Sequence, residues 1–364
     1  MKGDPIAGKR IYVIAEAGVN HNGNVELALD LVQAAADAGA DAVKFQLFRT
    51  EDLVSAFAPK ANYQLASTDR DETQQAMLQR LELSQSAFKE LHAHCARRGI
   101  EFLASPFDPE SVAFLADLGV SRIKLASGEI TNAKLLLAAA RTKLPILLST
   151  GMSQLGDIEA ALGVLAFGFL ESEAPPSSSA FREAYQSKAA RTALAEKVVL
   201  LHCTTEYPAP MADVNLKALN ALRTAFGLPV GYSDHTPGIA IPVAAAALDS
   251  VVIEKHLTLN RNLPGPDHKA SLEPDEFTRM VEGIRAVEQA QGSGVKAAAP
   301  SELGNRDIAR RSLVAASDIA CGDILTESNL AVRRPGNGIP ALYYYDWLGQ
   351  PAPRNYLKGE VILP

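Results

Sequence analysis

The stretch SVVIEKHLT, residues 250–258, starts as an apolar, β-branched run and then places Glu254, Lys255 and His256 one after another. An apolar strand with an ionisable end is typical of a buried parallel strand whose carboxyl end opens on a pocket. Seven earlier stretches are similar, and Ala- and Leu-rich segments with helical spacing lie between them. Strands are therefore expected over 11–18, 41–48, 100–105, 121–129, 144–151, 197–205, 229–236 and 250–258.

Eight strand-then-helix units in about 290 residues are typical of the α/β class and of a (β/α)8 TIM barrel. A doubly wound open sheet is the alternative, but it usually has a glycine-rich phosphate turn after its first strand, and AEAGVNHNG here contains no GxGxxG. We predict a barrel over 1–290, a linker over 291–306 and a small β-rich domain over 307–364. Residues 170–190 are predicted to form a loose, exposed insertion.

Composition and charge exclude several classes of protein. The 364 residues are 47% hydrophobic and 21% charged, as in soluble globular proteins, and the net charge of −7 argues against a nucleic-acid partner. The longest apolar run, 239–248, contains a proline and is too short for a membrane span. Cys95, Cys203 and Cys321 form no CxxC pair. We therefore expect a cytoplasmic protein without a membrane partner.

Histidines end two strands that are neighbours in a barrel. His235 and His256 converge on the rim where barrel active sites lie. Two neutral imidazoles there are suited to a divalent metal, with Asp234, Glu254 and Asp267 close by in the sequence. A pair of hydrogen-bonded structural histidines is the alternative that the spacing leaves open.

Two lysines interrupt otherwise apolar strands. Lys44 lies in AVKFQ and Lys124 in RIKLASG, where a buried ammonium is costly unless it is paired or faces an anion. Nearby strand ends add the small hydroxyl donors Ser105, Ser127, Ser149 and Ser233. Together these side chains are suited to a phosphate and a carboxylate. The alternative is an ion pair of Lys44 with Glu16, which otherwise fits a general acid or base.

Nine motifs in order resemble the sialic-acid (nonulosonic acid) synthase family over essentially the whole chain. They are IAEAGVNHNG, AVKFQ, SPFD, KLASGEITN, LSTGM, HCTTEYPAP, GYSDHT, EKHLTLNRNLPGPDHKASLEP and, in the tail, RRPGNGI. The tail resembles the antifreeze-like (SAF) domain of that family. So many motifs in the right order make the resemblance highly specific.

The resemblance implies a condensation of phosphoenolpyruvate with N-acetylmannosamine, or with a related 2-acetamido or 2,4-diacetamido mannose-type sugar. The products would be a sialic acid and phosphate, with cleavage of the C–O bond of phosphoenolpyruvate. The family's catalytic positions correspond to Glu16, His235, His256 and Arg334, and its phosphoenolpyruvate site to Lys44, Ser105, Lys124, Ser127, Ser149 and Ser233. Sugar contacts correspond to Tyr207, Asp267 and Arg334. His235 and His256 would ligate a divalent cation, usually manganese, with magnesium and cobalt as alternatives.

In the family, the arginine matched by Arg334 is lent by the tail of one subunit to the barrel of its partner. The resemblance therefore implies a homodimer with exchanged carboxyl-terminal domains. Two positions depart from some members of the family. Ser105 stands where others have threonine but keeps a hydroxyl, and Thr205 stands where others have asparagine.

The sequence leaves the sugar open between N-acetylneuraminate and N,N'-diacetyllegionaminate or pseudaminate synthases. A 3-deoxy sugar-acid phosphate synthase is a further alternative, but it would need extra cations for a second phosphate. A non-catalytic sugar- or ice-binding protein fits the tail alone. It leaves Glu16, both lysines and both histidines unexplained.

Overall fold

The computed structural model describes residues 10–69, 71–172 and 174–363. The chain divides into two compact units, the first ending at Gly292 and the second beginning at Ser293. Among the described residues, no helix is long and apolar enough to cross a membrane.

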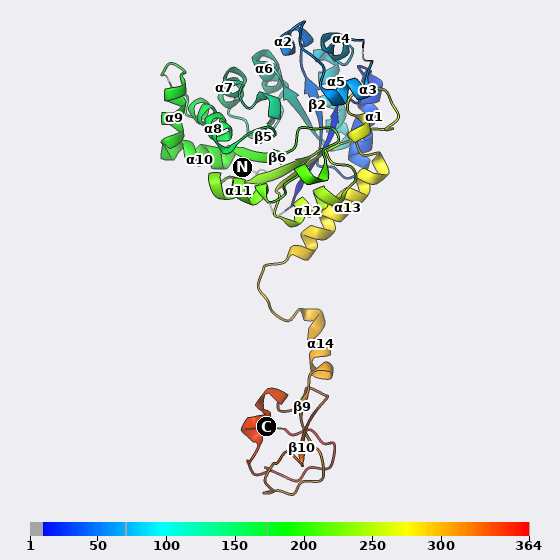
Figure 1. The fold of residues 1–364 in the computed structure, drawn as a ribbon, viewed down its shortest axis with the longest axis vertical. Coiled ribbons are helices and arrows are strands. Elements are labelled where there is room, and N and C mark those ends of the chain that lie inside the picture. Colours follow the sequence, from blue (N-terminus) through cyan, green and yellow to red (C-terminus); the bar gives the residue numbers. More distant parts are fainter. Residues whose placement is uncertain (1–9, 70, 173, 364) are drawn as a thin grey trace. The chain divides into compact units, whose positions relative to one another are not determined.

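The first unit is built on one eight-stranded parallel sheet with helices around it (Figure 1). Its strands are β1 Tyr12–Gly18, β2 Ala42–Leu47, β3 Glu101–Pro106, β4 Ile123–Leu125, β5 Ile146–Ser149, β6 Val198–Cys203, β7 Val230–Asp234 and β8 Val252–His256. The order is β3-β2-β1-β8-β7-β6-β5-β4, so the first and last strands pair directly. β3 and β4, at the two ends of this order, also lie against each other. The predicted (β/α)8 barrel is confirmed.

A helix follows each barrel strand: α1 Val25–Asp37, α5 Gln85–Arg98, α6 Pro109–Leu118, α7 Ala133–Arg141, α8 Leu155–Phe169, α11 Ala218–Phe226, α12 Ala240–Ala247 and α13 Pro274–Gln291. Local sequence sets their ends. Ser84 and Asp108 accept hydrogen bonds from first-turn amides of α5 and α6. Gly99 and Gly119 end the same helices in the left-handed conformation, which costs glycine no steric strain.

The inward-facing positions of the barrel change from apolar to polar along each strand. Its floor is an apolar cluster of Tyr12, Ile14, Ala42, Leu103, Leu147, Val199, Leu201 and Val252. Side chains alternate between the two faces of a strand, so the next inward position lies two residues further on. That step leads from Ile14 to Glu16, from Ala42 to Lys44 and from Leu103 to Ser105. The floor thus carries a polar layer toward the carboxyl ends of the strands.

The fourth strand is shorter than the sequence predicted. β4 ends at Leu125, and Ser127–Glu129 form a 3-10 helix, η2, instead of continuing the strand. The Ser127 hydroxyl accepts a hydrogen bond from the Gly151 amide at 3.0 Å. Ser127 therefore reaches the barrel mouth from a turn.

The insertion predicted over 170–190 is largely exposed, as expected, but the prediction that it is loose is wrong, because much of it is helical. α9 spans Ser178–Gln186 and α10 spans Lys188–Lys197, packed beside α8 (Figure 1). Phe181 and Tyr185 lie four residues apart and pack against the main core. The ring of Phe181 lies 5.2 Å from that of Phe167. The serines and prolines concealed this apolar helical spacing.

The second unit is small and β-rich, as predicted. β9 Ser312–Ala315 pairs antiparallel with β10 Leu330–Arg333. Leu313, Leu325 and Tyr356 belong to its own small core. The unit also contains η5 Ala341–Tyr343, α15 Tyr344–Trp347 and α14 Pro300–Ala309. Helix α14 begins inside the predicted linker, since Pro300 suits a first turn and Glu302 accepts the Ala299 amide at 2.8 Å. The boundaries given above for the linker and domains stay predictions.

One buried ion pair joins β7 to β8 on the side of the sheet opposite the polar layer. Lys255 Nζ lies 2.6 Å from Asp234 Oδ2, and both side chains are fully buried. Thr236 adds a hydroxyl at 2.9 Å from Asp234 Oδ1. Asp234 therefore belongs to the packing between strands, and it is not among the residues that line the barrel mouth.

We predict that Lys255→Met destabilises the barrel by about 3 kcal/mol, because removing one partner leaves a buried charge unpaired. The urea midpoint of unfolding, followed by circular dichroism, measures this loss. Arg98→Met is the matched control, because Arg98 pairs with Asp37 at 3.4 Å near the surface. Its effect should stay below about 1 kcal/mol. Equal shifts in the two variants would contradict a structural role for the buried pair.

Candidate active site

A pocket opens at the carboxyl ends of the barrel strands, above the apolar floor. It is lined by all eleven site residues that the sequence predicted in the barrel: Glu16, Lys44, Ser105, Lys124, Ser127, Ser149, Tyr207, Ser233, His235, His256 and Asp267. Residues from all eight strand ends or their following loops thus meet in one cavity, as the barrel topology requires.

Four buried charged side chains meet in this pocket, two of them lysines and two glutamates. Lys44 Nζ lies 2.6 Å from Glu16 Oε2 and 3.8 Å from Glu254 Oε2. Lys124 Nζ lies 3.4 Å from Glu254 Oε1. The Lys44–Glu16 ion pair, the alternative explanation of Lys44, is therefore present. Equal numbers of cations and anions compensate the cost of burying each charge.

The two glutamates have opposite pKa shifts. Burial raises the pKa of Glu16, and the charge of Lys44 opposes this only in part. Burial acts in the same sense on Glu254, but the charges of Lys124 and Lys44 outweigh it and lower the pKa to about 2. Glu254 is therefore the permanent anion of the pair, whereas Glu16 holds a proton more readily than an ordinary glutamate does.

The two lysines also differ. Burial acts to lower the pKa of Lys44, but the charges of Glu16 and Glu254 raise it above its usual value. Burial dominates for Lys124, whose pKa is lowered although Glu254 opposes the change. Both ammonium groups are nearly inaccessible to water, with 4% of each side chain exposed. An incoming anion would meet them where water screens little.

Hydroxyl groups surround the lysines, and two of them lack partners. Ser105 Oγ accepts from Lys44 Nζ at 3.2 Å, and Ser233 Oγ donates to Glu254 at 2.8 Å. Ser149 Oγ and Thr205 Oγ1 are buried without a hydrogen-bond partner among the described residues. An unsatisfied buried hydroxyl is costly, so these two are suited to a ligand with oxygen acceptors.

His235 and His256 face each other across 5.4 Å between ring centroids. Burial lowers the pKa of both, to about 4 for His235, so both rings are neutral. His235 Nδ1 donates to the Thr204 carbonyl at 2.6 Å, which leaves its Nε2 lone pair available. His256 Nδ1 is buried and has no hydrogen-bond partner. Neutral rings with available nitrogens fit a divalent metal.

The protein itself would supply few ligands to such a metal. No group of three or more His, Cys, Asp or Glu side chains suited to a metal occurs in the described part of the chain. Asp267 Oδ2 lies 4.0 Å from His256 Nδ1, close to the pair of rings. Two imidazoles would leave several coordination positions to water and substrate oxygens.

Tyr207 and Asp267 lie beside the histidines. The Tyr207 ring is 4.2 Å from that of His235 and 5.6 Å from that of His256. Burial and then the charge of Glu16 raise the pKa of Asp267 to about 7, with Lys44 opposing. Asp267 can therefore accept or donate a hydrogen bond at neutral pH.

Arg334 is the one predicted site residue outside this pocket. It belongs to the second unit, where its side chain is exposed and its Nε donates to the Ala309 carbonyl at 2.9 Å. Its predicted role at an active site stays a prediction.

Glu254 and Gln46 lie at predicted strand ends, but neither of them was predicted to have a role in the site. Both line the cavity, and each lies two residues from a predicted site residue on the same strand, where side chains share a face. Sequence reasoning missed other pocket residues entirely. Tyr63, Met77 and Leu81 come from the long connection between β2 and α5, where no strand pattern announced them.

The comparisons with known proteins agree with this geometry. Residues 31–296 match the NeuB family and residues 310–364 match the SAF domain. A protein of Campylobacter jejuni named N,N'-diacetyllegionaminic acid synthase is 49% identical over 97% of this chain and 99% of its own length. A Legionella pneumophila protein of the same name is 41% identical over 97% and 93%.

A solved structure is also similar. It is the N-acetylneuraminic acid synthetase of Leptospira borgpetersenii in complex with citrate, which is 31% identical. The match covers 82% of this chain and 91% of that one with a TM-score of 0.67. Family and fold matches over most of the chain confirm the resemblance drawn from the motifs. The chain belongs to the NeuB family, whose members condense phosphoenolpyruvate with an amino sugar to give a sugar acid, and it carries a SAF domain at its carboxyl end.

Proposed function

We propose that this protein makes N,N'-diacetyllegionaminic acid from phosphoenolpyruvate and a 2,4-diacetamido-2,4,6-trideoxy mannose-type sugar, with release of phosphate. The observation that carries the chemistry is one buried pocket that combines Lys44, Lys124, His235 and His256. The choice of sugar rests on relatives of that name at 49% and 41% identity, against 31% for the neuraminic acid synthetase.

Phosphoenolpyruvate is proposed to bind between the two lysines. Its phosphate and carboxylate would pair with the two lysines beside Glu254 and displace Glu16 from Lys44, and Ser149 and Thr205 would donate their unpartnered hydroxyls. Ser105, Ser127 and Ser233 lie around the same lysines and complete the proposed cradle. Thr205 offers one donor where an asparagine would offer two, so its hydroxyl suits a single oxygen acceptor.

The sugar aldehyde is proposed to lie at the two histidines. His235 and His256 would hold a divalent cation, for which we propose manganese, and the bound cation would polarise the aldehyde. Lys44 and Lys124 would hold phosphoenolpyruvate so that its C3 faces the aldehyde carbon. The new C–C bond forms there, water adds to C2, and the tetrahedral intermediate releases phosphate by cleavage of its C–O bond.

Glu16 is proposed as the group that moves protons in this sequence. Its raised pKa suits a general base for the water that adds to C2. Lys44 Nζ lies 2.6 Å from Glu16 Oε2. If Lys44 turned toward the phosphate, Glu16 would lose this positive neighbour, and the proton affinity of Glu16 would rise further. Glu254 would stay ionised and keep both lysines charged.

Location and assembly complete the proposal. Cys95, Cys203 and Cys321 are all free thiols, which fits the cytoplasm expected from the sequence. We also propose a homodimer in which the SAF domain of each subunit presents Arg334 to the barrel of its partner.

The rival sugar-phosphate synthase is disfavoured, because the described residues that line the pocket include no cation beyond Lys44 and Lys124.

The sugar is tested by phosphate release from phosphoenolpyruvate with a panel of acetamido sugars. We expect kcat/KM for the 2,4-diacetamido-2,4,6-trideoxy sugar to exceed that for N-acetylmannosamine by at least about tenfold, the discrimination that one or two substituents in a fitted pocket provide. A preference for N-acetylmannosamine would overturn the proposed sugar and leave the family reaction in place.

The metal is tested by removal and by binding. Chelation should abolish phosphate release, and manganese should restore it. Titration of the protein with Mn²⁺, followed by the electron paramagnetic resonance of the free ion, should show one tight site that His256→Ala loses. His94→Ala is the control, because His94 contacts Arg97 on α5 and should leave binding unchanged. Retention of the tight site in His256→Ala would refute the proposed ligands.

The exchanged tails are tested with mixed dimers. His256→Ala and Arg334→Ala chains, each with a different affinity tag, are co-expressed and purified through both tags. With exchange, one site of each mixed dimer is intact, so activity should be about half that of the wild type, although each variant alone is inactive. If each tail served its own barrel, every site would carry a defect and the mixed dimer would stay inactive. Failure to recover any doubly tagged protein would refute the dimer itself.

A further inference from the structure

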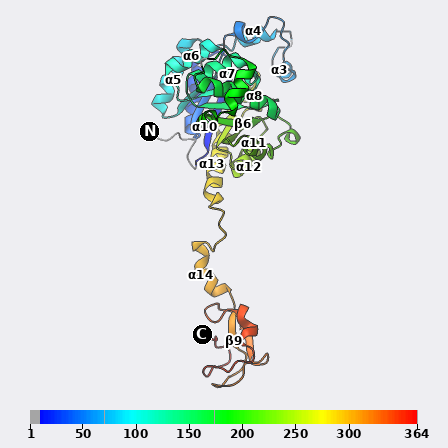
Figure 2. The same ribbon diagram turned by 90° about the vertical axis from the view of Figure 1, so that its left-hand side faces the viewer.

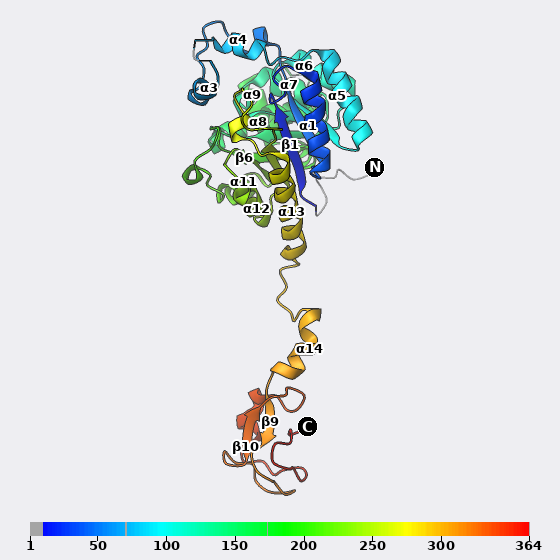
Figure 3. The same ribbon diagram turned by 90° about the vertical axis from the view of Figure 1, so that its right-hand side faces the viewer.

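The connection between β2 and α5 supplies one side of the pocket. It contains α2 Thr50–Leu53, α3 Asn62–Ser67 and α4 Gln74–Gln79. α3 and α4 stand out from the ring of barrel helices (Figure 2; Figure 3). Tyr63, Gln64, Met77, Leu78 and Leu81 from this connection line the pocket, although no barrel strand carries them.

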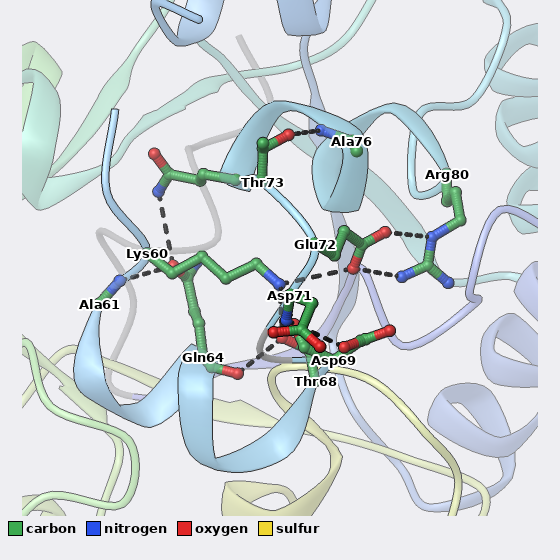
Figure 4. Close-up of polar contacts among 11 residues, drawn as sticks. Lys60, Ala61, Gln64, Thr68, Asp69, Asp71, Glu72, Thr73, Ala76 and Arg80 are labelled. Carbon is green, nitrogen blue, oxygen red and sulfur yellow. Dashed lines mark hydrogen bonds and ion pairs between the residues drawn. The ribbon is translucent and has the colours of Figure 1, made fainter. Parts of the chain in front are cut away.

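A polar network inside the connection fixes its shape (Figure 4). Lys60 Nζ donates to Thr68 Oγ1 at 3.1 Å and to the Asp69 carbonyl at 2.7 Å, and it lies 3.4 Å from Glu72. Arg80 binds the same Glu72 through two hydrogen bonds of 2.8 Å. Only 2% of the Lys60 side chain is exposed. Its ammonium is therefore committed to the connection and is not among the groups that line the pocket.

Gln64 belongs to the same network. Its side-chain oxygen accepts from the Ala61 amide at 2.9 Å and from Gln74 Nε2 at 3.4 Å, which ties the start of α3 to α4. Thr73 caps α4 by accepting from the Ala76 amide at 3.1 Å. The two short helices are thus held by side chains of their own segment, so the surface that they present to the pocket is preformed.

The surface that reaches the pocket from α4 is apolar. Met77, Leu78 and Leu81 line the cavity together with Val19 and Phe107 from neighbouring loops. We call these five residues the apolar wall. Val19, Leu78, Leu81 and Phe107 also belong to a small apolar cluster, separate from the main core, to which Phe48 and Leu53 contribute. The wall is therefore anchored by packing as well as by the polar network.

The proposed function would direct the far end of the sugar toward the connection that carries most of the wall. The aldehyde carbon is placed at His235 and His256 by the proposed function, on which this inference rests. The Tyr207 ring lies 4.2 Å from that of His235 at a tilt of 36°, and the Tyr63 ring lies 4.9 Å from that of Tyr207. This row of rings runs from the histidines to the connection that carries the wall. A six-carbon chain bound by its aldehyde along the row would direct C6 toward the wall.

We propose that the apolar wall selects sugars with a methyl group at C6. A methyl group would be buried against Met77, Leu78 and Leu81, which is favourable for apolar surface. A hydroxymethyl group would lose water without a partner among the five wall residues, and none of these five could pair with a phosphate. The specificity of the enzyme for a 6-deoxy sugar thus comes from the connection between β2 and α5.

The test compares the 2,4-diacetamido-2,4,6-trideoxy sugar with its 6-hydroxy counterpart. We expect the wild type to prefer the 6-deoxy sugar by about tenfold or more in kcat/KM. Leu78→Asn, which places an amide in the wall, should reduce that ratio at least about fivefold and leave KM for phosphoenolpyruvate unchanged. Leu53→Asn is the matched control, since Leu53 packs in the same apolar cluster but does not line the pocket. It should leave the ratio unchanged.

The outcomes distinguish a failure of the apolar wall as a selector from a failure of the proposed function. Equal use of the 6-deoxy and 6-hydroxy sugars by the wild type would overturn the wall as a selector, even if diacetamido sugars are preferred. An unchanged ratio in Leu78→Asn, or an equal fall in Leu53→Asn, would do the same. If the wild type uses N-acetylmannosamine instead, the proposed function fails, and the wall is tested by comparing N-acetylmannosamine with its 6-deoxy analogue.

Discussion

The buried group of two lysines and two glutamates is the interaction on which the site depends. None of these charges is stable in the barrel interior alone, because moving an unpaired ion out of water costs several kcal/mol. The strand register supplies the partners, since β1 places Glu16 beside Lys44 of β2 and beside His256 of β8. Closure of the sheet between its first and last strands is thus a condition for the charges as well as for the fold.

The same pairing sets the protonation state of each glutamate before substrate binds. In the proposed function, a phosphate-bearing anion would compete with the internal carboxylates for the lysines, so its binding would be an exchange of partners in a buried pocket. Glu254 is held ionised by both lysines, and it is the better counter-ion to retain. Glu16, with its raised pKa, is the easier one to displace or protonate. Two carboxylates in one cavity thereby acquire different chemistry from their surroundings alone.

Much of this could be predicted from the sequence, because strand patterns carry the information. Eight apolar runs with polar ends predicted the barrel, and nine of the eleven site residues that share one pocket lie at those ends. Tyr207 and Asp267, which lie in the loops that follow, were assigned to the site through the family resemblance. The pairing inside the pocket was harder to predict. The sequence left the partner of Lys44 undecided between a substrate anion and Glu16. Only the register of β1 and β2 places Lys44 and Glu16 2.6 Å apart.

The residues and elements that the sequence did not predict correctly lie where local structure follows no strand pattern. Tyr63 and Met77 lie in short helices held by a local polar network, which has no periodicity long enough to recognise. The connection over 170–190 was concealed by its serines and prolines, although Phe181 and Tyr185 carry the spacing of a buried helix face. Ser127 was assigned to the right pocket but to the wrong element, because a turn and a strand end can deliver a hydroxyl to the same place.

In the proposed function, the chemistry and the choice of sugar would depend on separate parts of this barrel. The charged groups lie on strands whose positions are fixed by the hydrogen-bonded ladders, and Glu16, Lys44 and Glu254 cannot move without breaking several pairs at once. Three of the five residues of the proposed sugar wall come from a connection that has its own polar network, and most of the wall packs in a small apolar cluster separate from the main core. Its composition can therefore change at little cost to the strand-end charges. Relatives named for N-acetylneuraminic acid and for N,N'-diacetyllegionaminic acid are both similar to this chain, and this separation gives a physical reason why one barrel accommodates different sugars.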